Sequence, residues 1–217
     1  VSEGTDAVRI RRMADAMEAA GARVLDVHSD AAHNRSVFTI TASRGELIEA
    51  CVRLAETASE IDLTRHRGIH PRLGGLDVCP FVPHGATGMD EAVDAARATA
   101  RTIGDRLGLP VYLYGEAALR PETRALPDLR RGGLPTLSKR AMGDLPPDAG
   151  PSEIDRRRGA VCVGARGPLI AFNVWLAADV DAARDIAARV RSGTVRALGL
   201  PLGPGLAQVS MNLIDPA

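Results

Sequence analysis

Amphipathic helical segments alternate with short apolar strands along most of this chain, and that alternation constrains its fold more than any other feature. Residues 6–20 repeat apolar side chains at helical spacing, and an apolar strand follows at 23–27. The same pairing recurs in a helical segment at 90–107 and a strand at 111–114. Because such alternation is typical of a sheet covered by helices, the sequence predicts an α/β fold.

The remaining segments follow the same two periodicities, with one long exception. Ser43 and Glu46 have the spacing of a capping box, which predicts that a helix begins there and runs to about Ile61. From 116 to 159 the pattern gives way to Pro, Gly and Arg, so we expect a loop region, and loops this long are usually functional or mobile. The other predicted elements are strands at 35–41, 76–82, 160–164, 169–176 and 206–214, a helix at 180–191 and a short segment at 194–198.

The balance of charge limits the partners that the chain can have. Lys and Arg together number 27, Asp and Glu together number 27, and the formal net charge is zero. There is no global basic field to hold nucleic acid or an anionic membrane, so we expect neither as a partner. Any anionic ligand has to be bound by a local cluster of side chains.

Cysteine usage and the absence of a long apolar run indicate the compartment. Cys51, Cys79 and Cys162 lie far apart in apolar contexts, which fits neither a disulfide framework nor metal-ligand spacing. Buried free thiols in a reducing cytoplasm are the plain interpretation. No apolar run reaches the length of a transmembrane helix, and no signal segment is evident, so we predict a cytoplasmic location.

A polar cluster at 66–81, read as HRGIHPRLGGLDVCPF, stands directly ahead of an apolar strand. Reactive side chains are common in loops that rigid elements hold in place. An imidazole, with an unperturbed pKa of roughly 6.5, can give or take a proton at neutral pH. His70 is the candidate catalytic residue, because Pro71 pre-sets the backbone, Arg72 supplies a cation and the following glycines let a ligand approach closely.

Other interpretations of this cluster stay open. His66 and His70 have the HxxxH spacing of many helical metal sites, but Pro71 opposes a helix and no third ligand is evident. We therefore place metal binding below catalysis and expect no metal. His70 could also be a structural histidine bonded to a loop carbonyl, and Arg72 could serve only to bridge to Asp77.

Three further polar segments are candidate binding regions. Residues 26–39 lie between two strands, where open α/β sheets bind ligands, although their Asp and Asn also suit a plain turn. Residues 150–159, GPSEIDRRRG, predict either a solvated charge run or a clamp for a carboxylate-bearing ligand. The last strand carries a row of Gln208, Ser210 and Asn212, for which we favour exposure to solvent over a ligand-facing role.

Five segments together resemble the formiminotransferase domain of glutamate formimidoyltransferases. They are HRGIHPRLGGLDVCPF, DVHSDAAHNRSVFT, VYLYGEAALRPETR, GARGPLIAFN and LAQVSMNLID, and VSEGTD looks like the tail of the family's opening PNFSEG segment. The resemblance implies two subdomains, at 1–167 and 168–217, with a ligand cleft between their sheets. The second subdomain is abbreviated relative to the family, and its uncovered apolar surface favours a homodimer.

The resemblance also implies a reaction, the transfer of a formimino group from N-formimino-L-glutamate to N5 of tetrahydrofolate in histidine breakdown. Tetrahydrofolate is then a co-substrate, and His70 matches the family's catalytic histidine as general acid-base. The family's folate-contacting loop matches, with no change of length, Gly150, Pro151, Ser152, Glu153, Ile154, Asp155, Arg156, Arg157, Arg158 and Gly159. The expected substrate-binding residues are His28, Asn34, Arg35, Arg72 and Asn173.

Departures from the family pattern leave two alternatives open. Ile69 stands where the family usually has an acidic residue just before the catalytic histidine. His28 stands where some members have Asp, and Trp175 replaces a common Asn. One alternative is a folate-dependent transferase with another one-carbon donor, such as a formyl amino acid. The other is a folate-binding protein that no longer catalyses.

Overall fold

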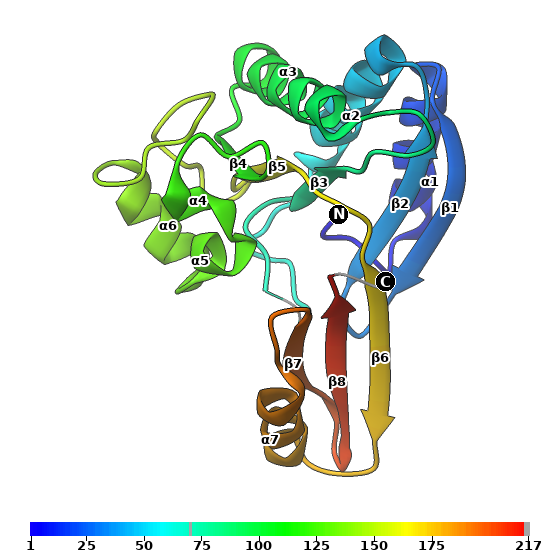
Figure 1. The fold of residues 1–217 in the computed structure, drawn as a ribbon, viewed down its shortest axis with the longest axis vertical. Coiled ribbons are helices and arrows are strands. Elements are labelled where there is room, and N and C mark those ends of the chain that lie inside the picture. Colours follow the sequence, from blue (N-terminus) through cyan, green and yellow to red (C-terminus); the bar gives the residue numbers. More distant parts are fainter. Residues whose placement is uncertain (70, 215–217) are drawn as a thin grey trace. The chain divides into compact units, whose positions relative to one another are not determined.

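The computed structural model describes residues 1–69 and 71–214, which form two compact units (Figure 1). The first unit is Val1–Arg166 and the second is Gly167–Ala217. This boundary lies one residue before the boundary expected from the sequence, which follows residue 167. Among the described residues, the first unit contains two sheets and two apolar clusters, and the second contains one of each. The predicted α/β fold is confirmed. In the described part of the chain, no helix is both long and apolar enough to cross a membrane.

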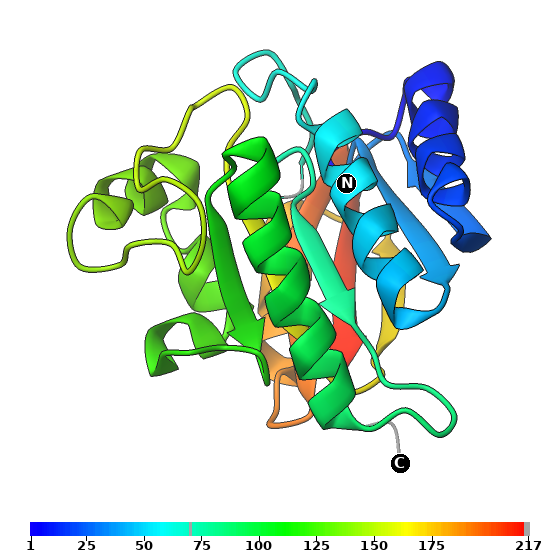
Figure 2. The same ribbon diagram turned by 90° about the horizontal axis from the view of Figure 1, so that it is seen from above.

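The centre of the first unit is a parallel sheet of three strands, in the order β3-β5-β4. These strands are β3 (Val78–Phe81), β4 (Val111–Gly115) and β5 (Val161–Ala165). Helix α3 (Met89–Leu107) lies along one face of this sheet (Figure 2), and α2 (Arg44–Ala58) packs beside α3. Because both faces of the sheet are covered, β4 and β5 read as continuous apolar runs.

A helix and a hairpin precede this sheet. Helix α1 (Ala7–Ala19) packs on α2, and β1 (Arg23–Asp30) pairs antiparallel with β2 (Arg35–Thr41). The predicted capping box is confirmed, because the Glu46 carboxylate accepts hydrogen bonds from the backbone nitrogen and the hydroxyl of Ser43, at 3.1 and 2.6 Å. The three cysteines are free and buried, as the sequence predicts.

The prediction of a loop throughout 116–159 is wrong for residues 121–141. Three short helices form there, α4 (Pro121–Arg124), α5 (Leu126–Arg130) and α6 (Gly133–Ala141). Helices α4 and α5 are too short to show a repeated helical pattern, and prolines stand in their first turns, where a missing N–H does no harm. Apolar side chains of this segment, Leu129 and Leu137 among them, bury the second face of the sheet against Tyr112.

The second unit is an antiparallel sheet with one helix. Strands β6 (Ile170–Leu176), β7 (Val195–Gly203) and β8 (Leu206–Leu213) take the order β6-β8-β7, and β7 is longer than the segment predicted at 194–198. Helix α7 (Val180–Val190) begins at Asp179, whose carboxylate accepts from the Ala182 backbone nitrogen at 2.9 Å. A small alanine-rich core joins α7 to the sheet.

Candidate functional site

Asp77 is the buried charge around which the candidate site is built. It lies just before β3, and its side chain has no exposed surface. One carboxylate oxygen accepts hydrogen bonds from Arg35, at 2.7 Å, and from the guanidinium of Arg130. The other accepts from the Leu73 backbone nitrogen at 2.7 Å. Burial alone would raise the pKa of Asp77, but the two guanidiniums and the backbone hydrogen bond outweigh it and lower the pKa to about 2.

Two segments far apart in sequence meet beside Asp77. Ala160 donates from its backbone nitrogen to the carbonyl of Leu73 at 2.8 Å, and Gly74 forms a bridge with Gly159. The loop that contains His70 is therefore joined to the end of the loop at 150–159. His70 itself lies outside the described residues, and its catalytic role stays a prediction.

In the loop that contains His70, Gly74 and Gly75 allow other backbone segments to pack closely against them. A Cβ on Gly74 would lie 2.1 Å from the carbonyl oxygen of Ala160, and a Cβ on Gly75 would lie 2.1 Å from that of Ala58. A side chain at either position would collide with main chain that cannot easily move. The explanation that these two glycines admit a ligand is therefore wrong, since the space beside them is filled by the protein itself.

Arg72 belongs to the loop that contains His70, and its side chain bonds to other residues of that loop. Its guanidinium bonds to Nδ1 of His66 and donates to the carbonyl of Gly68, the latter at 2.6 Å. A guanidinium only donates, so Nδ1 of His66 accepts and a neutral His66 carries its proton on Nε2. The bridge to Asp77 that the sequence suggested for Arg72 is supplied by Arg35 and Arg130. In the described part of the chain, no group of three or more His, Cys, Asp or Glu side chains is arranged to hold a metal ion.

The other predicted substrate-binding residues are spread over both units. Asn34 has a positive φ of 47° and ties two segments together, accepting from the Gly4 nitrogen at 2.8 Å and donating to the Arg67 carbonyl at 2.7 Å. His28 is exposed on β1. Asn173 is exposed on β6 of the second unit, opposite Ser210 of β8. Of the five predicted residues, the structure brings Asn34, Arg35 and Arg72 to the loop of His70.

The loop at 150–159 is ordered by its own contacts. Gly150 and Gly159 both have positive φ, 78° and 74°, and at each a Cβ would collide with a carbonyl oxygen, that of Leu109 or that of Leu73. Ile154 is buried in the core. Between these anchors the side chain of Arg157 reaches Asp62 at 3.2 Å. The run of three arginines is therefore held at fixed points along the fold.

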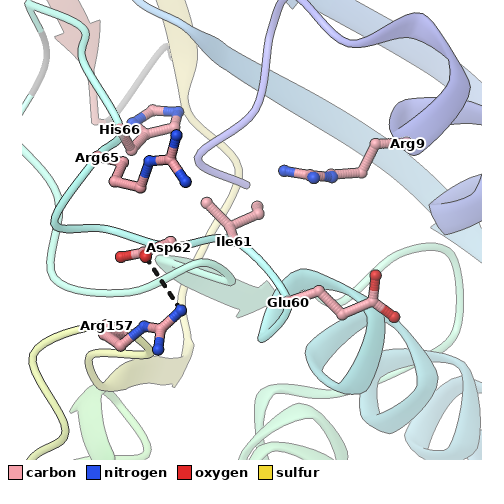
Figure 3. Close-up of a pocket in the computed structure, with 7 residues that line it drawn as sticks. All are labelled: Arg9, Glu60, Ile61, Asp62, Arg65, His66 and Arg157. Carbon is pink, nitrogen blue, oxygen red and sulfur yellow. Dashed lines mark ion pairs between the residues drawn. The ribbon is translucent and has the colours of Figure 1, made fainter.

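A pocket of about 360 Å³ lies where this loop meets the segment after α2 (Figure 3). Its wall combines one apolar side chain with charged and polar ones from three segments of the first unit. The lining residues are Arg9, Glu60, Ile61, Asp62, Arg65, His66 and Arg157.

Several residues of the site were not predicted from the sequence. Arg130 stands in a segment assigned to a loop, and nothing local indicates that it meets Asp77, which is 53 positions away. Arg9 and Arg65 look like ordinary surface arginines in a chain rich in that residue. The one available signal was Asp77 itself, an acid directly ahead of a buried strand.

Gln208, on β8 of the second unit, is not exposed to solvent as the sequence suggested. It is 2% exposed, and its side chain accepts a hydrogen bond from Trp175 Nε1 at 3.1 Å.

The family described as the formiminotransferase domain, N-terminal subdomain, matches residues 1–166. A glutamate formimidoyltransferase of Streptococcus pyogenes is 40% identical over 94% of this chain and 71% of its own length. One from Thermoplasma acidophilum is 38% identical over 99% of this chain and 74% of its own length.

A longer relative is also similar. The formimidoyltransferase-cyclodeaminase of Rattus norvegicus is 38% identical over 99% of this chain, which spans 42% of the rat protein. The family match covers the whole first unit, including the loop of His70, the Asp77 cluster and the loop at 150–159. This chain therefore belongs to the formiminotransferase domain family.

Proposed function

We propose that this protein transfers a formimino group from N-formimino-L-glutamate to N5 of tetrahydrofolate. Its relatives are named for formimidoyl transfer, which makes the chain a transferase of one-carbon groups. The observation that carries the proposal is the backbone hydrogen bond from Ala160 to Leu73, together with the β-bridge between Gly74 and Gly159. These contacts join the loop of the proposed catalytic histidine to the loop that resembles the family's folate-contacting segment.

The chemistry needs one group that both takes and gives a proton. N5 of tetrahydrofolate is a secondary amine, and it must lose a proton as it attacks the amidine carbon. The glutamate amine must gain a proton as it leaves. His70 performs both steps as general base and then general acid, since one titrating imidazole can do both. Holding donor and acceptor in attack geometry contributes several kcal/mol more.

The surroundings of the loop favour anionic substrates. Arg35 and Arg130 share the single charge of Asp77, so this cluster has an excess of one positive charge. Both proposed substrates carry carboxylates, which guanidinium groups bind well. Arg72, His28, Asn34 and Asn173 are proposed as further substrate contacts, and residues 150–159 as the folate contacts.

The proposal places the reaction in histidine breakdown and in the cytoplasm. A homodimer stays a prediction. Exposed apolar side chains on β6, Phe172 at 54% and Trp175 at 66%, are the surface on which it rests.

Replacing His70 tests the mechanism. In His70→Ala we expect kcat for formimino transfer, followed by mass spectrometry of the folate product, to fall by about 10²- to 10⁴-fold. The dissociation constant for tetrahydrofolate should stay within about twofold, because the other folate contacts remain. His84→Ala is the matched control, since His84 is an exposed turn residue, and it should leave both quantities unchanged.

Three outcomes contradict this assignment. Transfer from a formyl amino acid in place of N-formimino-L-glutamate would favour the alternative donor suggested by Ile69. Folate binding without transfer from any donor, unaffected by His70→Ala, would indicate a non-catalytic binding protein. A chain that binds neither tetrahydrofolate nor its analogues would refute the folate assignment as a whole.

A further inference from the structure

The pocket in the first unit contains more cationic groups than carboxylates. Arg9 enters it from α1, Arg65 from the segment after α2 and Arg157 from the loop at 150–159 (Figure 3). Against these three positive charges stand the two negative charges of Glu60 and Asp62. With a neutral His66, the lining carries one net positive charge.

Both carboxylates already have partners. Glu60 accepts from two nitrogens of Arg12, at 3.0 and 3.1 Å, and Arg12 is not among the lining residues. Asp62 accepts from the hydroxyl of Thr64 at 2.6 Å and pairs with Arg157 at 3.2 Å. Arg9 is paired in the same way, because it donates to the Glu3 carboxylate at 3.3 Å. Residues outside the lining therefore compensate one charge of each sign, and the lining keeps an excess of one positive charge.

Among residues 1–69 and 71–214, two donors in the pocket have no acceptor. The guanidinium of Arg65 is exposed and makes no hydrogen bond or ion pair within those ranges, although its charge helps to lower the pKa of Asp62. Nε2 of His66 is buried and also lacks a partner within those ranges. Because Nδ1 of His66 faces the guanidinium of Arg72, Nε2 is the protonated nitrogen and can only donate. A buried donor without an acceptor costs about 1–3 kcal/mol, so the site favours a ligand that brings an acceptor.

We propose that this pocket binds the two carboxylates of a glutamyl group. Arg65 and Nε2 of His66 would hold one carboxylate, and Arg9 the other, from the opposite side of Ile61 (Figure 3). Cationic groups on opposite sides suit a ligand with two separated charges, whereas a single phosphate needs them to converge. The inference rests on the proposed function, in which the formimino donor and tetrahydrofolate both carry a glutamyl group.

Arg65→Gln tests the pocket while preserving much of the shape of the side chain. The probe is glutarate, an aliphatic dicarboxylate, titrated into the full chain and followed by calorimetry. We expect its dissociation constant to rise about tenfold or more, since a hydrogen bond to a charged group is lost. Arg11→Gln is the matched control, because Arg11 is an exposed arginine of α1 paired with Asp15 at 2.8 Å, and it should bind glutarate as the wild type does.

Two further ligands identify the source of the glutamyl group. If it belongs to folate, Arg65→Gln weakens tetrahydrofolate but leaves tetrahydropteroate, which lacks the glutamyl group, unchanged. If it belongs to the donor, the variant raises KM for N-formimino-L-glutamate and leaves both pterins unchanged. Either result supports the proposal.

Equal behaviour of Arg65→Gln and Arg11→Gln toward glutarate, tetrahydrofolate and the donor overturns the proposal. That result with normal formimino transfer would reject the pocket alone and leave the proposed function intact. Glutarate binding that depends on Arg65, in a protein that transfers no formimino group, would reject the proposed function and retain the pocket.

Discussion

At the scale of single residues, the stability of the candidate site depends most directly on Asp77. The pKa of its carboxyl is lowered from 3.8 to about 2, so the stabilisation is complete above about pH 4 and is lost as the pH falls toward 2. In Asp77→Asn the guanidiniums of Arg35 and Arg130 lose the negatively charged carboxylate that both of them contact. We expect the free energy of unfolding at pH 7, measured with urea, to fall by about 3–5 kcal/mol.

The pH dependence of the free energy of unfolding separates the loss of the Asp77 charge from a change in side-chain packing. Between pH 4 and pH 2 the wild type loses its own charge at this site, so its stability should approach that of Asp77→Asn. Asp15→Asn is the control, because Asp15 forms an exposed pair with Arg11 and such pairs contribute about 0–1 kcal/mol. A difference between wild type and Asp77→Asn that stays constant down to pH 2 would contradict the assigned role of the charge.

At the scale of elements, the loop at 150–159 depends on close contact with the loop of His70. Gly159 has a φ of 74°, and a Cβ there would lie 2.0 Å from the carbonyl oxygen of Leu73. Gly159→Ala should therefore separate the two loops and lower the free energy of unfolding by about 1–3 kcal/mol, with weaker tetrahydrofolate binding. Gly45→Ala, in open space on α2, should instead raise stability by about 0.5–1 kcal/mol, because alanine favours a helix. Similar melting temperatures for the two variants would show that the contact is unimportant.

At the scale of the whole molecule, the first unit has an apolar core of its own. Both apolar clusters that cover its parallel sheet consist of residues up to Ala165. We expect the fragment Val1–Arg166 to fold alone and to unfold cooperatively on heating, monitored by circular dichroism. A fragment with helical signal but without a cooperative transition would show that the second unit is needed to fix its packing.

The order of helices and strands could be predicted from the sequence because the signals are local. Apolar periodicity places α1 and α3 within a residue or two, and the capping box at Ser43 marks the start of α2. Helices α4 and α5 were missed, since elements of four or five residues have no period to detect. Helix α6 was missed because glycine and proline stand in its first turn, where they suggest a loop. Resemblance at five motifs identified the family, which the match over residues 1–166 confirms.

By itself, then, the sequence determined the α/β class, the family and the candidate residues one segment at a time. Only the tertiary structure decided which of them meet. Arg35 and Arg130 reach Asp77 across 42 and 53 positions, and the pocket collects its arginines from three separate segments. No local pattern encodes such contacts, because an ion pair depends on where the packed backbone places each charge, whereas a helix or strand depends on its nearest neighbours in sequence.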